Sequence, residues 1–196
     1  MKKRLFDIVF SFFGLIVLSP ILILIAIIVK SDSKGPVFYR QIRVGLKNED
    51  FKIFKFRTMH INADKLGLLT IGDRDPRVTN SGYFFRKFKL DEFPQLINVL
   101  IGNMSFVGPR PEVRKYVNLY SEADLEILTV KPGITDYASI KFRDEAEIMN
   151  KSDKPEDVYI NEIMPEKIKL NKIYIKEQSF ITDLKIIFLT FVSIPF

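Results

Sequence analysis

Residues 8–29 read IVFSFFGLIVLSPILILIAIIV, an apolar stretch that contains no charged side chain. An α-helix needs about 20 such residues to cross the hydrocarbon core of a bilayer. Lys2, Lys3 and Arg4 precede the stretch, as they would in a secretory signal peptide. The apolar run is too long for a signal peptide, however, and no small-residue cleavage site precedes Lys30. We therefore predict a helix that stays inserted in a membrane.

Ser19 and Pro20 interrupt the middle of this stretch. Proline lacks a backbone N–H and its ring clashes with the preceding turn, so we expect the helix to kink or break there. Lys30 and Lys34 make the second flank basic like the first, and basic flanks favour the cytoplasmic side. These two observations predict a re-entrant membrane helix at residues 1–30. A kinked spanning helix is the alternative that the residues leave open.

The remaining residues, 31–196, have a mixed composition and predict one domain that is mainly α-helical. Aromatic and β-branched residues fill 37–44 and 51–59, and a polar segment separates them, which is the pattern of a small β-hairpin. Lys55 and Arg57 would share one face of the second strand.

Three later segments have helical patterns. Residues 113–129 and 161–176 read as amphipathic or charged helices. Residues 179–196 are apolar apart from two charges, which favours an interfacial helix lying in the membrane plane; a buried core helix is the alternative.

Composition restricts the partners and the metals. The net charge of +6 and the pI near 9.4 favour an anionic partner, whether nucleic acid, acidic lipid or a phosphorylated small molecule. There is no cysteine and only one histidine, His60, so a zinc site of the usual type is excluded. Any metal must be a hard cation held by carboxylates, which indicates Mg²⁺, with Mn²⁺ as the alternative.

The residues most able to carry chemistry lie at 86–96, RKFKLDEFPQL. A run of mixed charges is ordinarily a solvated helix face. Here Phe93 precedes a proline, so it marks a boundary, and Pro94 suits the first position of a new helix. Asp91 and Glu92 would then lie just before a helix start, where backbone donors and the helix dipole attract anions.

Arg110 lies between Pro109 and Pro111, which restrict the backbone on both sides. A guanidinium with a fixed direction is suited to bidentate phosphate binding. A rigid surface turn is the plainer reading of the same motif.

Together these motifs resemble the bacterial sugar transferases, the monotopic polyprenyl-phosphate phosphoglycosyl transferases, in their minimal catalytic form. The resemblance covers nearly the whole chain and rests on the Ser19-Pro20 break, FKFRTM (54–59), DPRVT (75–79), LDEFPQL (90–96), NVLIGNMSFVGPRP (98–111) and KPGIT (131–135).

The resemblance implies a two-step reaction on the cytoplasmic face of the bacterial inner membrane. Asp91 would take a phosphosugar from a UDP-sugar and release UMP, and polyprenyl (undecaprenyl) phosphate would then accept that group. Glu92 would hold Mg²⁺. The residues implied to bind phosphate are Arg110 and Arg86 and, more weakly, Lys55, Arg57 and Arg143. Membrane lipids and downstream glycosyltransferases are the other implied partners, in surface glycan or glycoprotein glycan assembly, including capsule and lipopolysaccharide.

The sequence departs from the family pattern after Thr135. Many relatives continue Gly-Leu-Ala-Gln-Val-Asn-Gly-Arg, whereas residues 136–143 here read DYASIKFR and keep only Ala138 and the final arginine, Arg143. A later aspartate corresponds to Asn171. If this segment reads the sugar or nucleotide, the donor differs from that of the commoner members.

A non-enzymatic alternative is a membrane-anchored basic protein that binds an anionic partner or acts as a scaffold. The net charge of +6 favours it. No nucleic-acid-binding motif occurs in the sequence, so nucleic acid is not expected as a partner.

Overall fold

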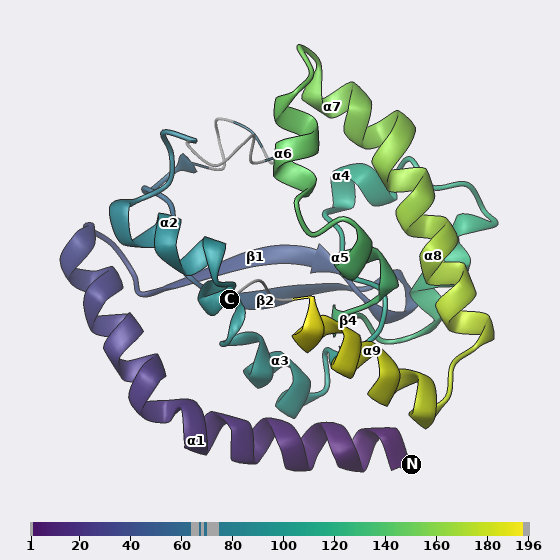
Figure 1. Cartoon of the computed structure of the whole chain (residues 1–196), viewed down its shortest axis with the longest axis horizontal. Coiled ribbons are helices and arrows are strands. Elements are labelled where there is room, and N and C mark those ends of the chain that lie inside the picture. The colour runs from purple at the N-terminus through teal and green to yellow at the C-terminus, as the bar shows by residue number, and fades with distance from the viewer. Residues whose placement is uncertain (1, 64–66, 68, 70–74, 194–196) are drawn as a thin grey trace.

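The computed structural model describes residues 2–63, 67, 69 and 75–193. The helices are α1 (Lys2–Asp32), α2 (Asn80–Lys87), α3 (Gln95–Ile101), α4 (Arg114–Val117), α5 (Tyr137–Lys141), α6 (Glu145–Asn150), α7 (Pro155–Val158), α8 (Met164–Lys176) and α9 (Phe180–Val192). The strands are β1 (Phe38–Val44), β2 (Asp50–Phe56), β3 (Ser105–Val107) and β4 (Gly133–Thr135). The predicted class, mainly helical with a small β-hairpin, is confirmed (Figure 1).

Helix α1 continues through Pro20 and bends near its middle (Figure 1). Because Pro20 has no N–H, the carbonyl of Ile16 loses its usual donor one turn later. The Ser19 hydroxyl donates to that carbonyl at 2.7 Å. The Ser-Pro pair therefore bends the helix without breaking it, since the serine satisfies the oxygen that the proline leaves free.

The start of α1 is attached to the rest of the chain by charged side chains. Lys3 donates to the carbonyl of Val107 at 2.9 Å and pairs with Asp183 of α9 at 2.6 Å. The buried carboxylate of Asp7 accepts from the backbone N–H of Phe106 at 3.2 Å. Strand β3 and helix α9 are thus both joined to the first two turns of α1.

The end of α1 is attached to the same body by Arg57, which follows β2 directly. Its guanidinium has five N–H donors, and all five are used. The acceptors are the carbonyls of Val29, Ser33, Lys34 and Pro36 and the hydroxyl of Ser33. Asp32 also accepts from the N–H and hydroxyl of Ser81 at 2.9 and 2.7 Å.

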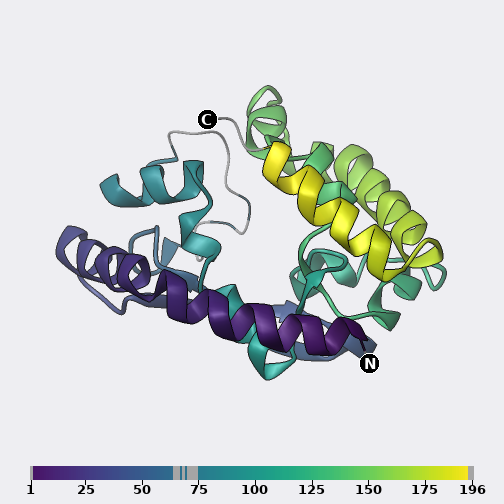
Figure 2. The same cartoon turned by 60° about the horizontal axis from the view of Figure 1, so that its bottom comes forward.

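By length and composition α1 could cross a membrane. Its middle exposes many apolar side chains, and in Figures 1 and 2 the rest of the chain lies along one side of it. Contacts at both ends with one body are the arrangement expected of the re-entrant topology predicted above, which stays a prediction.

The hairpin is antiparallel, with Phe38 opposite Phe56 and Val44 opposite Asp50. Helix α3 covers the open edge of β2 through Asn98. This side chain accepts from the N–H of Phe54 at 2.9 Å and donates to the carbonyl of Lys52 at 2.8 Å. Residues 95–101 are thereby fixed against the strand that carries Lys55.

Two of the helical predictions are settled by the structure. The pattern at 161–176 becomes α8, after a π-helical turn at Tyr159–Ile163. The pattern at 113–129 was wrong as a single helix: only α4 and a 3₁₀ segment, Asp124–Thr129, form there. Asp124 accepts from the N–H of Ser121 at 3.2 Å and from its hydroxyl at 2.6 Å, and such local side-chain bonds compete with a continuous helix.

Helix α9 occupies most of the predicted segment 179–196, of which residues 194–196 lie outside the described part. Ile186 and Asp183 are buried on one face. The opposite face exposes six large apolar side chains: Phe180, Ile181, Leu184, Phe188, Phe191 and Val192. A fully buried core helix does not fit this exposure, and the interfacial placement stays a prediction.

The topology of α1 can be tested with single cysteines, because the chain has none of its own. We expect Lys2→Cys and Lys34→Cys to react with a membrane-impermeant maleimide from the same side as a control in the body, Asp153→Cys. The measurement is labelling of right-side-out and inverted membrane vesicles. Labelling of Lys2→Cys and Lys34→Cys from opposite sides would establish a spanning helix instead.

Candidate active site

A tight change of chain direction presents Asp91 and Glu92. Helix α2 ends at Lys87, Lys89 takes the left-handed conformation at φ 55°, and Leu90–Glu92 form a 3₁₀ turn. Helix α3 then begins at Gln95, so the predicted helix start at this proline is found one residue later, with Pro94 as the N-cap. Phe93 itself takes the right-handed helical conformation, because it closes the 3₁₀ turn, so the expectation that it would avoid that conformation was wrong. The two carboxylates precede the helix start, as expected.

Glu92 lies between two cations from distant parts of the chain. Its Oε1 accepts from Lys55 Nζ of β2 at 2.9 Å and from the guanidinium of Arg110, which follows β3. Burial opposes ionisation of Glu92, but Arg110 and Lys55 together outweigh it and hold its pKa well below the usual range. Conversely, the charge of Glu92 raises the pKa of Arg110. Burial lowers the pKa of Lys55, an effect that Glu92 partly offsets.

Asp91 has a different environment from its neighbour. Its side chain is buried, and Oδ1 has no hydrogen-bond partner among the described residues. Burial raises the pKa of Asp91, whereas the charges of Lys55 and Arg86 act to lower it. Asp91 is thus a carboxylate surrounded by cations but not paired with one in the described part of the chain.

This difference separates the chemistry that the two residues can perform. Glu92 is held as an anion by direct bonds to Lys55 and Arg110, so it suits a structural or ligand-binding role. Asp91 Oδ1 is bonded to no other group among the described residues, so it could bond to a reacting group, as a nucleophile must. The surrounding cations could stabilise phosphate charge that develops beside it.

Arg110 is fixed by its backbone as well as by its side chain. Glycines permit the chain to pass very closely here: a Cβ on Gly133 would lie 2.1 Å from the N of Gly108. The N–H of Gly108 donates to Thr135 at 3.1 Å, and Arg110 Nη1 donates to the carbonyl of Ile134 at 3.3 Å. The segment after β3 is therefore joined to β4 along its length.

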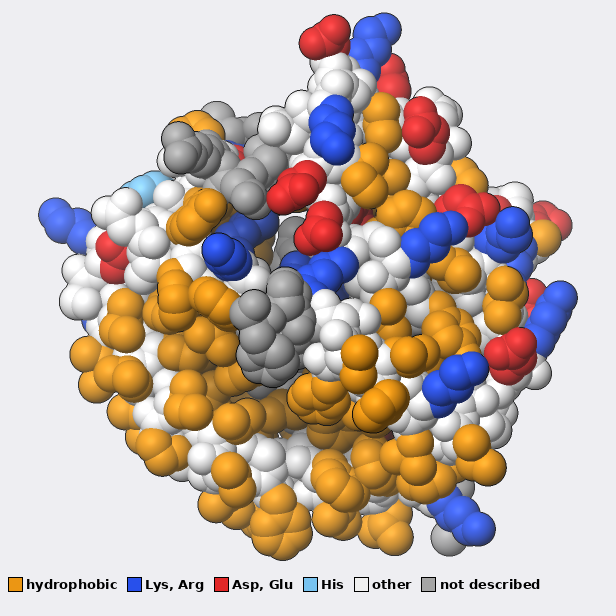
Figure 3. Space-filling view, viewed as in Figure 1, with side chains coloured by type: hydrophobic (Ala, Val, Ile, Leu, Met, Phe, Trp, Pro, Cys, Tyr) orange, Lys and Arg blue, Asp and Glu red, His pale blue; other side chains and the backbone are white. Residues whose placement is uncertain are grey.

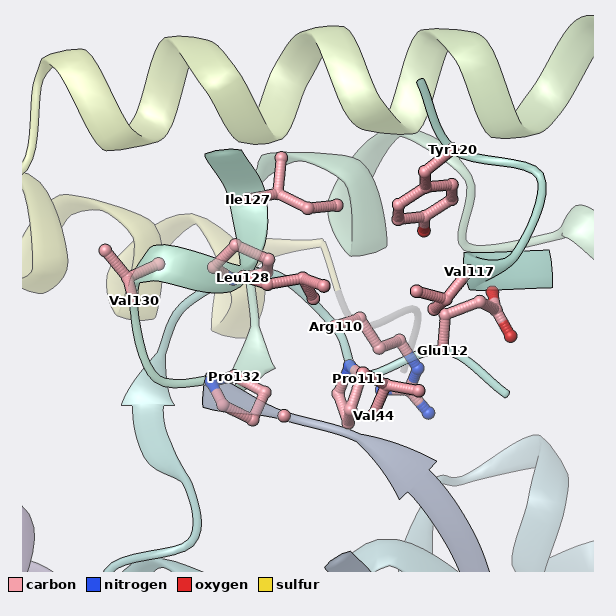
Figure 4. Close-up of a pocket in the computed structure, with 12 residues that line it drawn as sticks. Val44, Arg110, Pro111, Glu112, Val117, Tyr120, Ile127, Leu128, Val130 and Pro132 are labelled. Atoms are coloured by element: carbon pink, nitrogen blue, oxygen red, sulfur yellow. The ribbon is translucent and has the colours of Figure 1, made fainter. Parts of the chain in front are cut away.

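A small cavity of about 10 Å³ lies beside this segment (Figure 4). Arg110 and Glu112 reach it, and its other lining is largely apolar, including Val117, Ile127 and Leu128. That volume admits roughly one water molecule. It does not include Asp91 or Glu92 and is too small for a nucleotide.

The structure brings some predicted site residues together and leaves others apart. Lys55, Arg110 and Arg86 lie around the Asp91–Glu92 pair. Arg57 does not join them, since all five of its donors are committed to the end of α1 and the segment that follows it.

Arg143 lies in the turn between α5 and α6. Glu145, two residues later, pairs with Lys167 at 2.5 Å. No contact joins Arg143 itself to the pair within the described residues.

Sequence reasoning missed two residues at the site. Gln95 is fully buried one turn after Asp91, and neither amide atom has a partner in the described part of the chain. Asp136 is fully buried and accepts from the backbone N–H of Arg110 at 3.0 Å. The departure from the family pattern at 136 was a signal for the second; the apolar surroundings of Gln95 were the only signal for the first.

The donor set fits one kind of magnesium site. The described residues contain no cluster of three or more carboxylate, histidine or cysteine ligands, so they form no cage of protein ligands alone. Mg²⁺ commonly keeps its waters and binds one or two carboxylates together with substrate phosphates. Glu92 would supply one such carboxylate, since its bonds to Lys55 and Arg110 both use the same oxygen, Oε1.

Comparison with known sequences shows the family to which the chain belongs. The family profile described as bacterial sugar transferase matches residues 1–195. The chain belongs to this family. A sugar transferase of Bacillus subtilis (strain 168), named uncharacterized EpsL, is 37% identical over 188 residues, covering 96% of this chain and 84% of the relative. The exopolysaccharide production protein PSS of Rhizobium leguminosarum bv. phaseoli is 35% identical, with 97% and 94% covered.

Longer sugar transferases match the same region. A UDP-glucose:undecaprenyl-phosphate glucose-1-phosphate transferase of Klebsiella pneumoniae is 41% identical over 192 residues, which are 96% of this chain but 39% of that protein. The chain thus spans about two fifths of the length of this relative.

Replacing Asp91 by Asn should stabilise the protein at neutral pH. The folded state raises the pKa of the Asp91 carboxyl group. Asp91 therefore contributes most to stability at a pH below its pKa in the unfolded state, and this contribution is lost as the pH rises through its pKa in the folded state. The amide carries no charge to bury, so we expect Asp91→Asn to gain about 1–3 kcal/mol at pH 7. Thermal unfolding of both proteins in detergent from pH 4 to pH 8 measures this gain in stability.

The difference in free energy of unfolding between Asp91→Asn and the wild type should decrease as the pH is lowered towards 4. The exposed Asp153→Asn is the control and should leave the midpoint unchanged. A loss of stability in Asp91→Asn at every pH would contradict the burial argument.

Proposed function

We propose that this chain transfers a sugar 1-phosphate from a UDP-sugar to polyprenyl phosphate and releases UMP. The observation that carries the proposal is the buried acidic pair: Glu92 is bound by Lys55 and Arg110, while Asp91 Oδ1 has no hydrogen-bond partner among the described residues. The names of relatives support it, because several are undecaprenyl-phosphate transferases of UDP-glucose or UDP-N-acetylgalactosamine.

In the first step a carboxylate oxygen of Asp91 attacks the phosphorus next to the sugar. The bond between that phosphorus and the bridging oxygen breaks, and UMP leaves with the electron pair. The product is a phosphosugar joined to the Asp91 carboxylate, an acyl phosphate. Arg110 and Lys55 are placed to stabilise negative charge on the transferred group and on the departing UMP. Bound Mg²⁺ would neutralise the charge of the diphosphate.

In the second step an oxygen of polyprenyl phosphate attacks the same phosphorus. The bond to Asp91 breaks, the carboxylate is regenerated, and a polyprenyl diphosphate sugar is released. Because one face of the site must admit a lipid, the acceptor phosphate has to arrive from the membrane surface. The bent helix α1, with its body on one side, suits this approach.

Two surfaces support membrane placement. Hydrophobic side chains cover the lower part of the face in Figure 3, over α1, α3 and α9, while charged side chains surround a hollow above them. A groove of about 160 Å³ opens beside Pro94 and is lined only by apolar residues: Leu15, Leu22, Ile23, Ala26, Phe38, Phe56, Pro94 and Ile97. Since Pro94 follows the acidic pair by two positions, the groove could take the isoprenoid chain nearest the acceptor phosphate.

The reaction is tested in membranes supplied with Mg²⁺, polyprenyl phosphate and a panel of UDP-sugars. We expect UMP release and a lipid diphosphate sugar with at least one donor. Asp91→Asn should lower turnover by about 1,000-fold or more, because the nucleophile is lost, and Asp153→Asn should not. Without acceptor, intact-protein mass spectrometry should detect the phosphosugar on wild type alone. Wild-type turnover by Asp91→Asn would exclude Asp91 as nucleophile.

Filling the apolar groove should affect only the second step. We expect Ala26→Phe to leave the single burst of UMP unchanged and to slow transfer to polyprenyl phosphate about tenfold, because the added ring occupies the chain's space. Val17→Phe, on the exposed side of α1, is the matched control. Rapid-quench measurement of both half-reactions checks this, and equal transfer rates for the two variants would remove the groove from the acceptor path.

A further inference from the structure

Asp136 is fully buried and holds two backbone segments together. Its Oδ2 accepts from the N–H of Arg110 at 3.0 Å, and its Oδ1 accepts from the N–H of Ser139 at 2.5 Å, which caps α5. No salt bridge to a lysine or arginine side chain involves it in the described part of the chain. Both of its oxygens are therefore used on backbone donors.

The bond to Arg110 completes a row of contacts between residues 108–110 and 133–136. Before it, Gly108 donates to Thr135 at 3.1 Å and Gly133 donates to the carbonyl of Pro109 at 3.0 Å. Pro109 and Pro111 have no N–H, so the N–H of Arg110 is the only backbone donor from 109 to 111. Asp136 accepts the hydrogen bond from this N–H and so fixes the backbone of Arg110, the residue whose side chain extends to Glu92.

An aspartate fits this place better than its amide analogue. Two N–H groups converge on one side chain, and only a carboxylate offers an acceptor oxygen to each. Asparagine would keep one acceptor and turn an NH₂ group towards the other N–H, leaving a buried donor unpaired. The carboxylate also favours the positive charge of Arg110, whose pKa it helps to raise.

We propose that Asp136 is a positioning residue for Arg110, which couples the start of α5 to the phosphate-binding arginine. The proposal deepens the function proposed above and rests on it. Asp136 touches no reacting atom; it acts by fixing the backbone from which Arg110 reaches Glu92. The segment that departs from the family pattern thereby influences the chemistry at Asp91 without entering the site.

The test is a double-mutant cycle on the first half-reaction, UMP release. We expect Asp136→Asn to lower kcat about 10- to 100-fold, because misplacing a catalytic group by about 1 Å has effects of that size. In an Arg110→Ala background, Asp136→Asn should lower kcat less than about twofold, since no guanidinium is left to position. Equal losses in both backgrounds would overturn the proposal and leave Asp136 a merely structural residue.

A second readout does not depend on activity. Hydrogen–deuterium exchange of the peptide around Arg110 should accelerate in Asp136→Ala, and Asp124→Asn is the matched control, an aspartate that also accepts from a backbone N–H but lies elsewhere. If wild type releases no UMP with any donor, the proposed function fails, and unchanged exchange at Arg110 would separately overturn the positioning role.

Discussion

The site depends on one buried interaction, the carboxylate of Glu92 shared by Lys55 and Arg110. A buried charge is costly unless it is paired, so these three groups must meet for the chain to fold this way. They come from β2, from the turn before α3 and from the segment after β3. Their meeting fixes three separate elements at one point. It also leaves Asp91, the preceding residue, near these cations without a direct bond to either among the described residues.

Local patterns in the sequence predicted much of this arrangement, and the distant contacts account for the rest. Pro94 marked the start of α3 and Arg110 the rigid turn, because both depend on the residues themselves. Lys55 and Arg57 could not be separated in that way, since the predicted strand at 51–59 puts both on one face, whereas β2 ends at Phe56. In the structure Lys55 binds Glu92, whereas Arg57 binds carbonyl groups at and after the end of α1. The partner of each side chain depends on the element that packs against it, which the local sequence does not give. Likewise the bond from Arg110 to Asp136 spans 26 positions.

Helix α1 and the acidic pair are connected through β3. Lys3 and Asp7 bind the backbone of Val107 and Phe106, and Arg110 follows three residues later. Arg4 also donates to two carbonyls at the end of α3, the helix that begins beside the acidic pair. The elements that carry the site are therefore held against the first turns of α1, so the height of α1 in the membrane would set the height of the site above it.

In the proposed reaction one carboxylate must serve two opposed purposes. It attacks phosphorus in the first step, which a more basic oxygen does better, and it departs in the second, which a less basic one does better. Burial raises the pKa of Asp91, while Lys55 and Arg86 act to lower it. If Asp91 were paired directly, as Glu92 is, its oxygens would be both less basic and less available. In the proposed reaction, cations held one residue away, on Glu92, would stabilise phosphate charge in both steps, while Asp91 Oδ1 stays without a hydrogen-bond partner among the described residues.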